Sequence, residues 1–182
     1  MDASRRRAPR GFTLLECLMA LAVAALLLGI AAPDFSRTLS ERALAVQASQ
    51  FMSALRFARS EAVKRGQPVV VCASDPAAPG VSCQPQGRAD WRAGWIVFAD
   101  PSGTDRPETS RLLRVQQPFA RTGGIEGTRS AMTFTAGGFS KDAASHFRFE
   151  PPGDAKPGGA RAVLVCVSKQ GKARVAPGEV CA

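Results

Sequence analysis

Hydrophobic residues are concentrated in one continuous stretch near the N-terminus. Residues 12–32 carry a single charged side chain, Glu16. At a helical rise of about 1.5 Å per residue this stretch reaches roughly 30 Å, the thickness of the hydrocarbon core of a bilayer. Four arginines precede it within residues 1–11, and basic residues favour the cytoplasmic side. Residues 12–33 are therefore predicted to form one membrane-spanning helix that places the C-terminus across the membrane.

A different pattern, with one apolar stripe, follows in residues 34–66. Its apolar positions alternate spacings of four and three, as on one face of a helix; they are Leu44, Ala48, Phe51, Leu55, Ala58 and Ala62. Arg42, Arg56, Arg59, Glu61 and Lys64 lie off this stripe, and Gly66 with Pro68 ends the helix. This amphipathic half is predicted to pack on a folded domain, and Pro33 marks either a hinge or the membrane exit.

Beyond Gly66 the chain changes to short runs of β-branched and aromatic residues, separated by Gly, Pro, Asp and Ser. The predicted strands are Pro68–Ala73, Trp95–Ala99, Leu112–Gln116, Met132–Thr135, Phe147–Glu150, Ala162–Val167 and Ala173–Val175. A long helix followed by strands is typical of an α+β fold in which an antiparallel sheet packs on the helix. Residues 67–182 are predicted to form this β-rich domain, with loops over residues 75–92 and 150–159.

Charge indicates the class of partner. The chain has 24 Lys and Arg against 15 Asp and Glu, a net charge of +9. Residues 1–11 contain four arginines and Asp2, so the remainder has 20 bases and 14 acids, a net charge of about +6. This balance favours anionic partners.

The cysteines point to disulfides rather than to a metal. Cys17 lies in the apolar run and is predicted to be a small apolar residue of the membrane helix, while four cysteines lie in the polar part of the chain. They lack CxxC spacing, and the chain has one histidine, so no metal site is predicted. Two disulfides in an oxidising compartment fit better. Of the three possible pairings we predict the local one, Cys72–Cys83 with Cys166–Cys181.

An enzyme is not predicted. His146 lies in the alternating segment 145–149, where an exposed strand position is expected, and the acid pairs Asp105 with Glu108 and Asp90 with Asp100 lie in turn-rich loops. No glycine-rich phosphate loop or metal cluster is present in the sequence. We therefore predict no catalytic residue and no cofactor.

A short motif joins the basic segment to the apolar one. It reads Gly11-Phe12-Thr13-Leu14-Leu15-Glu16. A secretory signal peptide cleaved near Ala31–Ala32 is the alternative interpretation, but a carboxylate in an apolar span costs about 3 kcal/mol and needs a partner. The motif closely resembles the signature of type IV pilins and pseudopilins.

That resemblance implies how the N-terminus is processed. Residues 1–11 would be a leader that prepilin peptidase removes by cutting between Gly11 and Phe12, and Phe12 would then be N-methylated. In the filament, Glu16 would pair with the terminal amine of a neighbouring subunit, so that two buried charges neutralise each other. An acid that extends to the membrane interface is the alternative for Glu16.

Three later segments narrow the resemblance to a subgroup. They are residues 58–66 (ARSEAVKRG), residues 69–72 (VVVC), and Trp91 with residues 94–98 (GWIVF) and Asp100. Together they resemble the GspH/FimT group of minor pilins and pseudopilins, including FimU-like proteins, over nearly the whole chain. The resemblance implies the type IV pilin fold. Trp91 and Trp95 are expected to be core residues at a strand entry rather than stacking partners of a ligand.

The same group implies location and partners. The protein would be a single-pass protein of the bacterial inner membrane with a periplasmic C-terminal domain, and would then enter a filament. Its partners would be other minor and major pilins or pseudopilins and the prepilin peptidase that also methylates. We predict a minor pilin of the tip or priming complex of a type IV pilus, supporting assembly, twitching motility and DNA uptake. A minor pseudopilin of a type II secretion system is the alternative.

A basic hairpin near the C-terminus suggests an additional role. Gly171 marks a turn with Lys169, Lys172 and Arg174 nearby, and residues 171–174 resemble the GRxR motif that FimT-like pilins associate with DNA binding. Here Lys172 replaces the first arginine, which keeps the charge but loses the planar fork that grips phosphate. These four residues are the predicted contacts to double-stranded DNA. The alternative is a solvated hairpin that closes the sheet or contacts a neighbouring subunit.

Overall fold

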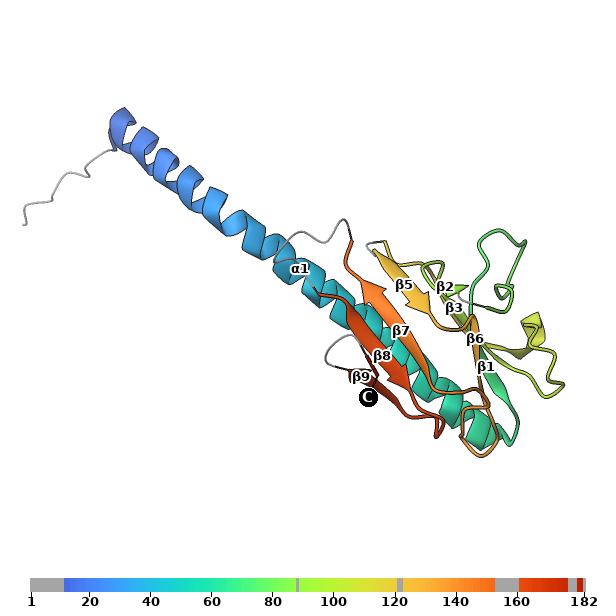
Figure 1. The fold of residues 1–182 in the computed structure, drawn as a ribbon. Coiled ribbons are helices and arrows are strands. Elements are labelled where there is room, and N and C mark those ends of the chain that lie inside the picture. Colours follow the sequence, from blue (N-terminus) through green and yellow to red (C-terminus); the bar gives the residue numbers. More distant parts are fainter. Residues whose placement is uncertain (1–11, 88, 121–122, 153–160, 177–179, 182) are drawn as a thin grey trace, which may run out of the picture. The chain divides into compact units, whose positions relative to one another are not determined.

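The structure is a computed structural model that describes residues 12–87, 89–120, 123–152, 161–176 and 180–181, with the side chains of residues 28–36 and 89 outside the description. The described residues up to Arg37 and those from Thr38 onward form two compact units. Helix α1 (Leu14–Arg65) contributes residues to both (Figure 1).

In the first unit, Thr13 caps the start of helix α1. Its Oγ1 accepts a hydrogen bond from the backbone N–H of Glu16 at 3.3 Å, and its carbonyl accepts one from Cys17 at 3.2 Å. A threonine in this position satisfies N–H groups that have no partner within the helix. The helix therefore begins at Leu14, two residues later than predicted.

Apolar side chains of the described part of this unit are exposed, among them Phe12, Leu14 and Leu26. Cys17 is an exposed free thiol. Within the described residues, no helix has an 18-residue stretch apolar enough to cross a membrane. The span predicted over residues 12–33 includes side chains outside the described set, and it stays a prediction.

The second unit is built on the predicted apolar stripe. All six stripe residues of helix α1 are at most 1% exposed, which confirms the helical interpretation of residues 44–62. One charged residue differs from the expectation: the side chain of Glu61 is only 11% exposed, and its carboxylate accepts a 2.6 Å hydrogen bond from Arg65 Nε. Arg65 and the exposed Lys64 keep this acid paired at the edge of the stripe.

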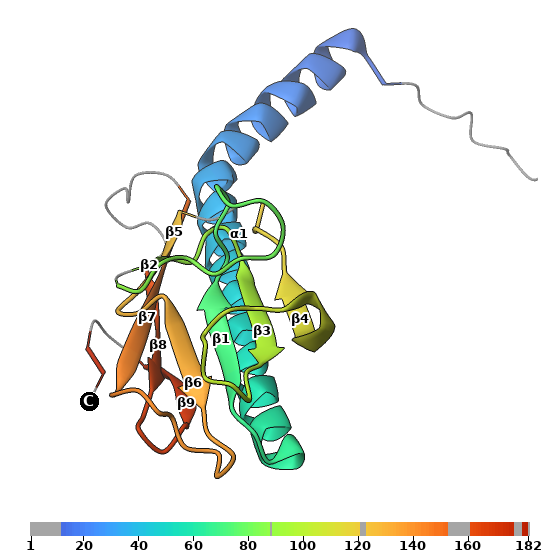
Figure 2. The same ribbon diagram turned by 90° about the vertical axis from the view of Figure 1, so that its right-hand side faces the viewer.

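The described chain contains nine strands and one short 3₁₀ helix, η1 (Thr109–Arg111). The strands are β1 (Val69–Ala73), β2 (Ala89–Asp90), β3 (Trp95–Ala99), β4 (Leu112–Gln116), β5 (Gly124–Gly127), β6 (Ala131–Phe134), β7 (Ser145–Glu150), β8 (Val163–Val167) and β9 (Ala173–Ala176). They form two antiparallel sheets, ordered β4-β3-β1-β6 and β2-β5-β7-β8-β9. Figures 1 and 2 show both sheets alongside the second half of helix α1.

The structure corrects the prediction in two respects. It has two sheets where one was expected, and it has two strands that were not predicted, β2 and β5. Strand β5 reads Gly-Ile-Glu-Gly, which resembles a turn in composition. It pairs with β7 because glycine leaves room for a tryptophan: a Cβ on Gly127 would lie 2.4 Å from Trp91 Nε1, which donates to the carbonyl of Arg129 at 2.9 Å. The close approach, invisible in the sequence, makes this segment a strand.

Phe51 is the centre of the core. Its ring contacts four aromatic rings, from Trp91 and Trp95 and from Phe147 and Phe149 of β7, at centroid distances of 4.6–5.7 Å. Both tryptophans are fully buried, which confirms them as core residues. Helix α1 is thus joined to both sheets through one aromatic cluster.

The disulfide Cys72–Cys83 holds a loop over the outer face of the four-stranded sheet. All five residues of β1 are buried, because helix α1 covers one face while Cys83 and Leu112 cover Val70 and Cys72 on the other. The backbone N–H of Gln84 also donates to the carbonyl of Ala73 at 2.9 Å. The loop therefore completes the burial of a central strand.

Candidate functional site

The residues predicted for N-terminal processing are described only in part. Gly11 lies outside the described residues. Phe12 is 79% exposed, and Glu16 is exposed in the first turn of helix α1. This geometry leaves both side chains accessible to another molecule.

The histidine and one of the acids considered for an enzyme have other surroundings than a catalytic site needs. His146 is exposed on β7, as expected. Asp100 is buried, and its carboxylate accepts backbone hydrogen bonds from Thr104 at 3.1 Å and Asp105 at 2.8 Å, which orders a turn. In the part of the chain that the structure describes, no group of three His, Cys, Asp or Glu residues could hold a metal ion.

The predicted C-terminal hairpin is present as β8 and β9. The N–H of Ser168 donates to the carbonyl of Lys172 at 2.9 Å, and the N–H of Gly171 donates to that of Ser168 at 2.8 Å. The disulfide Cys166–Cys181 ties the end of the chain to β8. Both disulfides are thus the local pairs that were predicted.

Gly171 does more than form the turn. Its φ is +73°, a conformation that favours glycine. A Cβ at this position would lie 2.5 Å from the carbonyl oxygen of Gly138 and 3.3 Å from the ring of Phe134. The hairpin turn therefore abuts the β6–β7 connection so closely that only glycine fits.

The three basic residues of the hairpin, Lys169, Lys172 and Arg174, are all exposed. Ala173 packs against the main core, whereas Arg174 pairs in register with Cys166, which belongs to a cluster on the other face of the sheet. Successive side chains of a strand point to opposite faces, so Arg174 points away from helix α1. Lys172 precedes β9 and lies in the hairpin turn beside Gly171.

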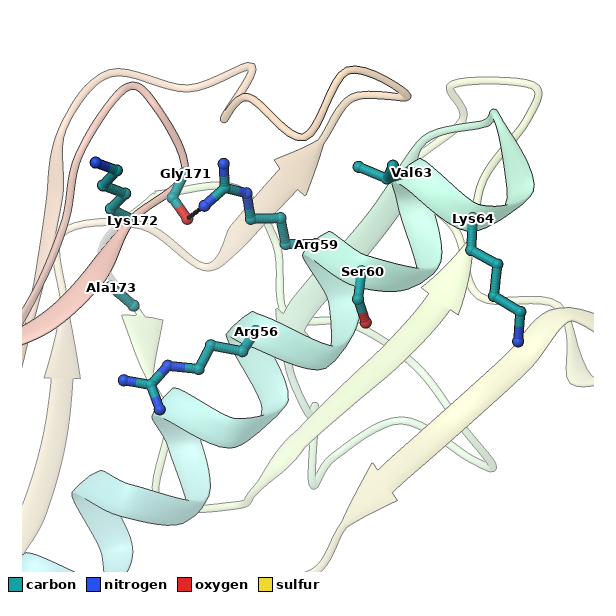
Figure 3. Close-up of a pocket in the computed structure, with 8 residues that line it drawn as sticks. All are labelled: Arg56, Arg59, Ser60, Val63, Lys64, Gly171, Lys172 and Ala173. Carbon is teal, nitrogen blue, oxygen red and sulfur yellow. Dashed lines mark hydrogen bonds between the residues drawn. The ribbon is translucent and has the colours of Figure 1, made fainter.

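Lys172 is among the residues that line a groove between helix α1 and the hairpin turn, and its side chain points away from the helix (Figure 3). The groove has a volume of about 670 Å³. Its lining residues are Arg56, Arg59, Ser60, Val63, Lys64, Gly171, Lys172 and Ala173. We call it the α1–hairpin groove.

Arg59 connects the two walls of this groove. Its Nη1 donates to the carbonyl oxygen of Gly171 at 3.4 Å, which directs the guanidinium toward the hairpin (Figure 3). Figure 3 also shows Arg56 extending on the hairpin side of the helix, whereas Lys64 points away from it. The groove thus carries the positive charges of Arg56 and Arg59, and that of Lys172 lies at its rim.

The basic residues that line the groove differ in whether a carboxylate lies close to them. Lys64 Nζ lies 3.7 Å from Glu61 Oε1. The hydrogen bond from Arg65, aided by the nearby charge of Lys64, holds the pKa of Glu61 below its ordinary value. Among the described residues, no carboxylate lies within 4.0 Å of the charged atoms of Arg56 or Lys172. The groove therefore has positive charge that its described surroundings do not neutralise.

Sequence reasoning found Lys172 but missed Arg56 and Arg59. Arg59 and Gly171 are 112 positions apart, so their contact has no local signal. The sequence did hold a weak signal for the two arginines. Arg56 and Arg59 are three residues apart, which places both on the same side of the helix, next to the stripe that contains the buried Ala58.

A second pocket, of about 390 Å³, lies near the β5–β6 connection. Its charged residues include Arg129 and Asp142, which pair with each other at 3.6 Å, and Asp142 also accepts the N–H of Thr133 at 3.0 Å. Because these groups satisfy one another, the pocket offers a ligand less than the α1–hairpin groove does.

Two family models match the chain, one at its N-terminal segment and one over most of the remainder. The family model described as type II transport protein GspH matches residues 47–171, and that of the prokaryotic N-terminal methylation motif matches residues 6–32. No curated protein matches the chain in a sequence comparison.

Two crystal structures of the type IV minor pilin FimU from Pseudomonas aeruginosa (strain PAO1) are similar to the chain. One is 21% identical, covers 74% of this chain and 93% of that one, and has a TM-score of 0.53. The other is 20% identical, covers 75% and 90%, and has a TM-score of 0.55. At these identities the likeness concerns the fold, which is the pilin-like α+β arrangement expected from the sequence.

Proposed function

The chain belongs to the family of the type II transport protein GspH, and from this premise we propose that it is a minor pilin of a type IV pilus, not an enzyme. One observation carries the proposal: a single chain combines the N-terminal methylation motif at residues 6–32 with the GspH domain at residues 47–171. The likeness of its fold to a type IV minor pilin supports the choice.

We propose that prepilin peptidase cuts between Gly11 and Phe12 and that Phe12 is then N-methylated. The chain would be held in the inner membrane by residues 12–33, with residues 67–182 in the periplasm, until it enters the filament. Glu16 would pair with the amine of a neighbouring subunit. The capped first turn supports this arrangement, because Thr13 holds Glu16 next to the new N-terminus.

Mass spectrometry of the chain from its native cells tests the processing step. The expected N-terminus is a methylated Phe12, and any other N-terminus would contradict the proposal. Filament incorporation tests the pairing. Removing one partner of a buried ion pair costs about 3–5 kcal/mol, so Glu16→Gln should be processed normally yet nearly absent from sheared filaments, whereas Glu41→Gln should be incorporated like the wild type.

A minor pseudopilin of a type II secretion system is the second candidate, and the description of the matching family favours it. Two phenotypes separate these functions. A deletion strain of a minor pilin loses twitching motility and DNA uptake while it still secretes its exoproteins. Loss of secretion with normal twitching would reverse our choice.

We further propose that the hairpin binds double-stranded DNA through Lys169, Lys172 and Arg174, with Gly171 shaping the turn. The exposure of the three basic side chains supports this role, as does the absence of an ion-pair partner for them among the described residues. Contacts to phosphates release counterions, so binding should weaken steeply as salt rises. Gel-shift titration at low salt should show weaker binding for Lys172→Ala/Arg174→Ala, and identical curves would refute this role.

A further inference from the structure

The α1–hairpin groove combines apolar surface with positive charge. Val63 contributes an apolar side chain that is 54% exposed, and Ala173 forms part of the opposite wall. Arg56 and Arg59 supply charge within the groove, and Lys172 supplies it at the rim. A ligand that fits this surface needs anionic groups and an apolar group close together.

The groove is a formed feature, because close contacts fix its walls. A Cβ on Gly138 would lie 3.0 Å from Val63 Cγ2 and 3.3 Å from Arg59 Nε, so the β6–β7 connection lies directly against the helix. The same connection meets Gly171 of the hairpin turn, and Arg59 bonds to the Gly171 carbonyl. Three segments distant in sequence thus hold one another, and little ordering is left for a ligand to bring about.

From this combination we infer that the α1–hairpin groove is a docking site for an acidic peptide segment with an apolar anchor residue, carried by a neighbouring subunit of the filament. The inference rests on the proposed function, since the neighbour is another pilin. Carboxylates would bind Arg56, Arg59 and Lys172, and the apolar side chain would pack on Val63 and Ala173.

Charge identifies the partner more closely. Without residues 1–11 the chain has 20 Lys and Arg against 14 Asp and Glu, a net charge of about +6, so a second copy would bring mainly positive charge to a positive groove. Like charges placed face to face oppose association, whereas an acidic partner gains both attraction and a faster encounter. The segment therefore belongs to a different, acidic subunit. DNA has the charge but lacks the aliphatic anchor that the exposed Val63 would cover.

Binding can be measured on the full-length processed chain in detergent micelles by fluorescence anisotropy. The probe is a short fluorescein-labelled peptide of alternating Glu and Leu, and the control peptide has Gln in place of Glu. Signal from protein-free micelles is subtracted. The wild type should bind the Glu peptide and should bind the Gln peptide at least about tenfold more weakly, because charge–charge contacts are lost.

Two double variants locate the site at equal net charge. Arg56→Ala/Lys172→Ala removes two charges from the groove, and Lys169→Ala/Arg174→Ala removes two from the rest of the hairpin. We expect the first to weaken binding about tenfold and the second less than twofold. All four side chains are at least partly exposed, so both proteins should fold. Val63→Ser tests the apolar contact separately and should weaken binding about fivefold.

Several results would overturn the inference: no binding by the wild type, equal binding of the Glu and Gln peptides, or equal loss in the two double variants. A labelled DNA duplex that displaces the peptide, and whose own binding depends on Arg56, would assign the groove to nucleic acid instead. None of these results touches the proposal that the chain is a minor pilin, which is judged by the Phe12 N-terminus and by incorporation into filaments.

Discussion

Replacing Gly171 by alanine measures how much the close approach of two turns contributes to the domain. Gly171 has a φ of +73°, and an added Cβ would lie 2.5 Å from a backbone oxygen of Gly138. Backbone cannot yield as the end of a long side chain can, so the hairpin turn must move. The same movement would take the Gly171 carbonyl away from Arg59 and open the α1–hairpin groove.

The expected loss in the free energy of unfolding has two parts, backbone strain and overpacking, and a comparison with Gly103 separates them. Gly103 has a similar φ of +67°, but an added Cβ there meets nothing within 4 Å. Gly103→Ala should therefore lower the free energy of unfolding by about 1 kcal/mol. This is the strain of a left-handed alanine, reduced by the stabilisation that comes from restricting the unfolded chain. Gly171→Ala adds overpacking of about 1–3 kcal/mol, for a total of about 2–4 kcal/mol.

Urea denaturation followed by tryptophan fluorescence measures both values. Trp91 and Trp95 are the two tryptophans of the chain and are fully buried, so their emission reports unfolding of the core. The free energy of unfolding should fall more for Gly171→Ala than for Gly103→Ala by at least about 1 kcal/mol. Equal losses would refute the reasoning, because backbone strain alone would then explain the effect of replacing Gly171.

Three further predictions concern the core, an ion pair and a disulfide. Phe51→Ala should lower the free energy of unfolding by about 3–5 kcal/mol in the same assay, and Phe51→Leu by distinctly less; similar losses would contradict a central role for the ring. Since Arg65 lowers the pKa of Glu61, their pair stabilises the fold above the ordinary glutamate pKa of about 4.3, and this contribution disappears as the pH falls through the lower folded value. The melting temperature of Glu61→Gln should therefore lie below that of the wild type at pH 7 and approach it in acid, and a constant difference would contradict the pairing. Cys181→Ser, which opens the Cys166–Cys181 loop, should cost about 3 kcal/mol without reducing agent, and an unchanged urea midpoint would show that the bond adds no stability.

Local signals in the sequence carried the helix and most of the strands. The stripe from Leu44 to Ala62 follows the helical period, and each of its six residues is buried. Runs such as Val69–Ala73 and Trp95–Ala99 have the composition of strands and lie between turn residues. These elements could be predicted because spacing and composition within a few residues decide them.

Strand β5 is an element that local signals in the sequence do not predict. A segment that reads Gly-Ile-Glu-Gly has weak strand propensity, and it pairs with β7 because Gly127 makes room for the ring of Trp91, 36 positions earlier in the chain. The division into two sheets has the same origin. Pairing partners far apart in sequence are chosen by packing on the helix, which no local pattern records.

For the candidate site, the sequence by itself determined which residues carry charge and which form the turn: Lys169, Gly171, Lys172 and Arg174 were all identified from residue types and spacing. Only the tertiary structure decided how they are grouped. Strand alternation turns Arg174 away from helix α1, while Gly171 accepts a hydrogen bond from Arg59 of a helix more than 100 positions earlier, and Lys172 lines the same groove as Arg56 and Arg59. The physical reason is that charge and turn propensity belong to single residues, whereas a groove exists only where distant segments come into contact.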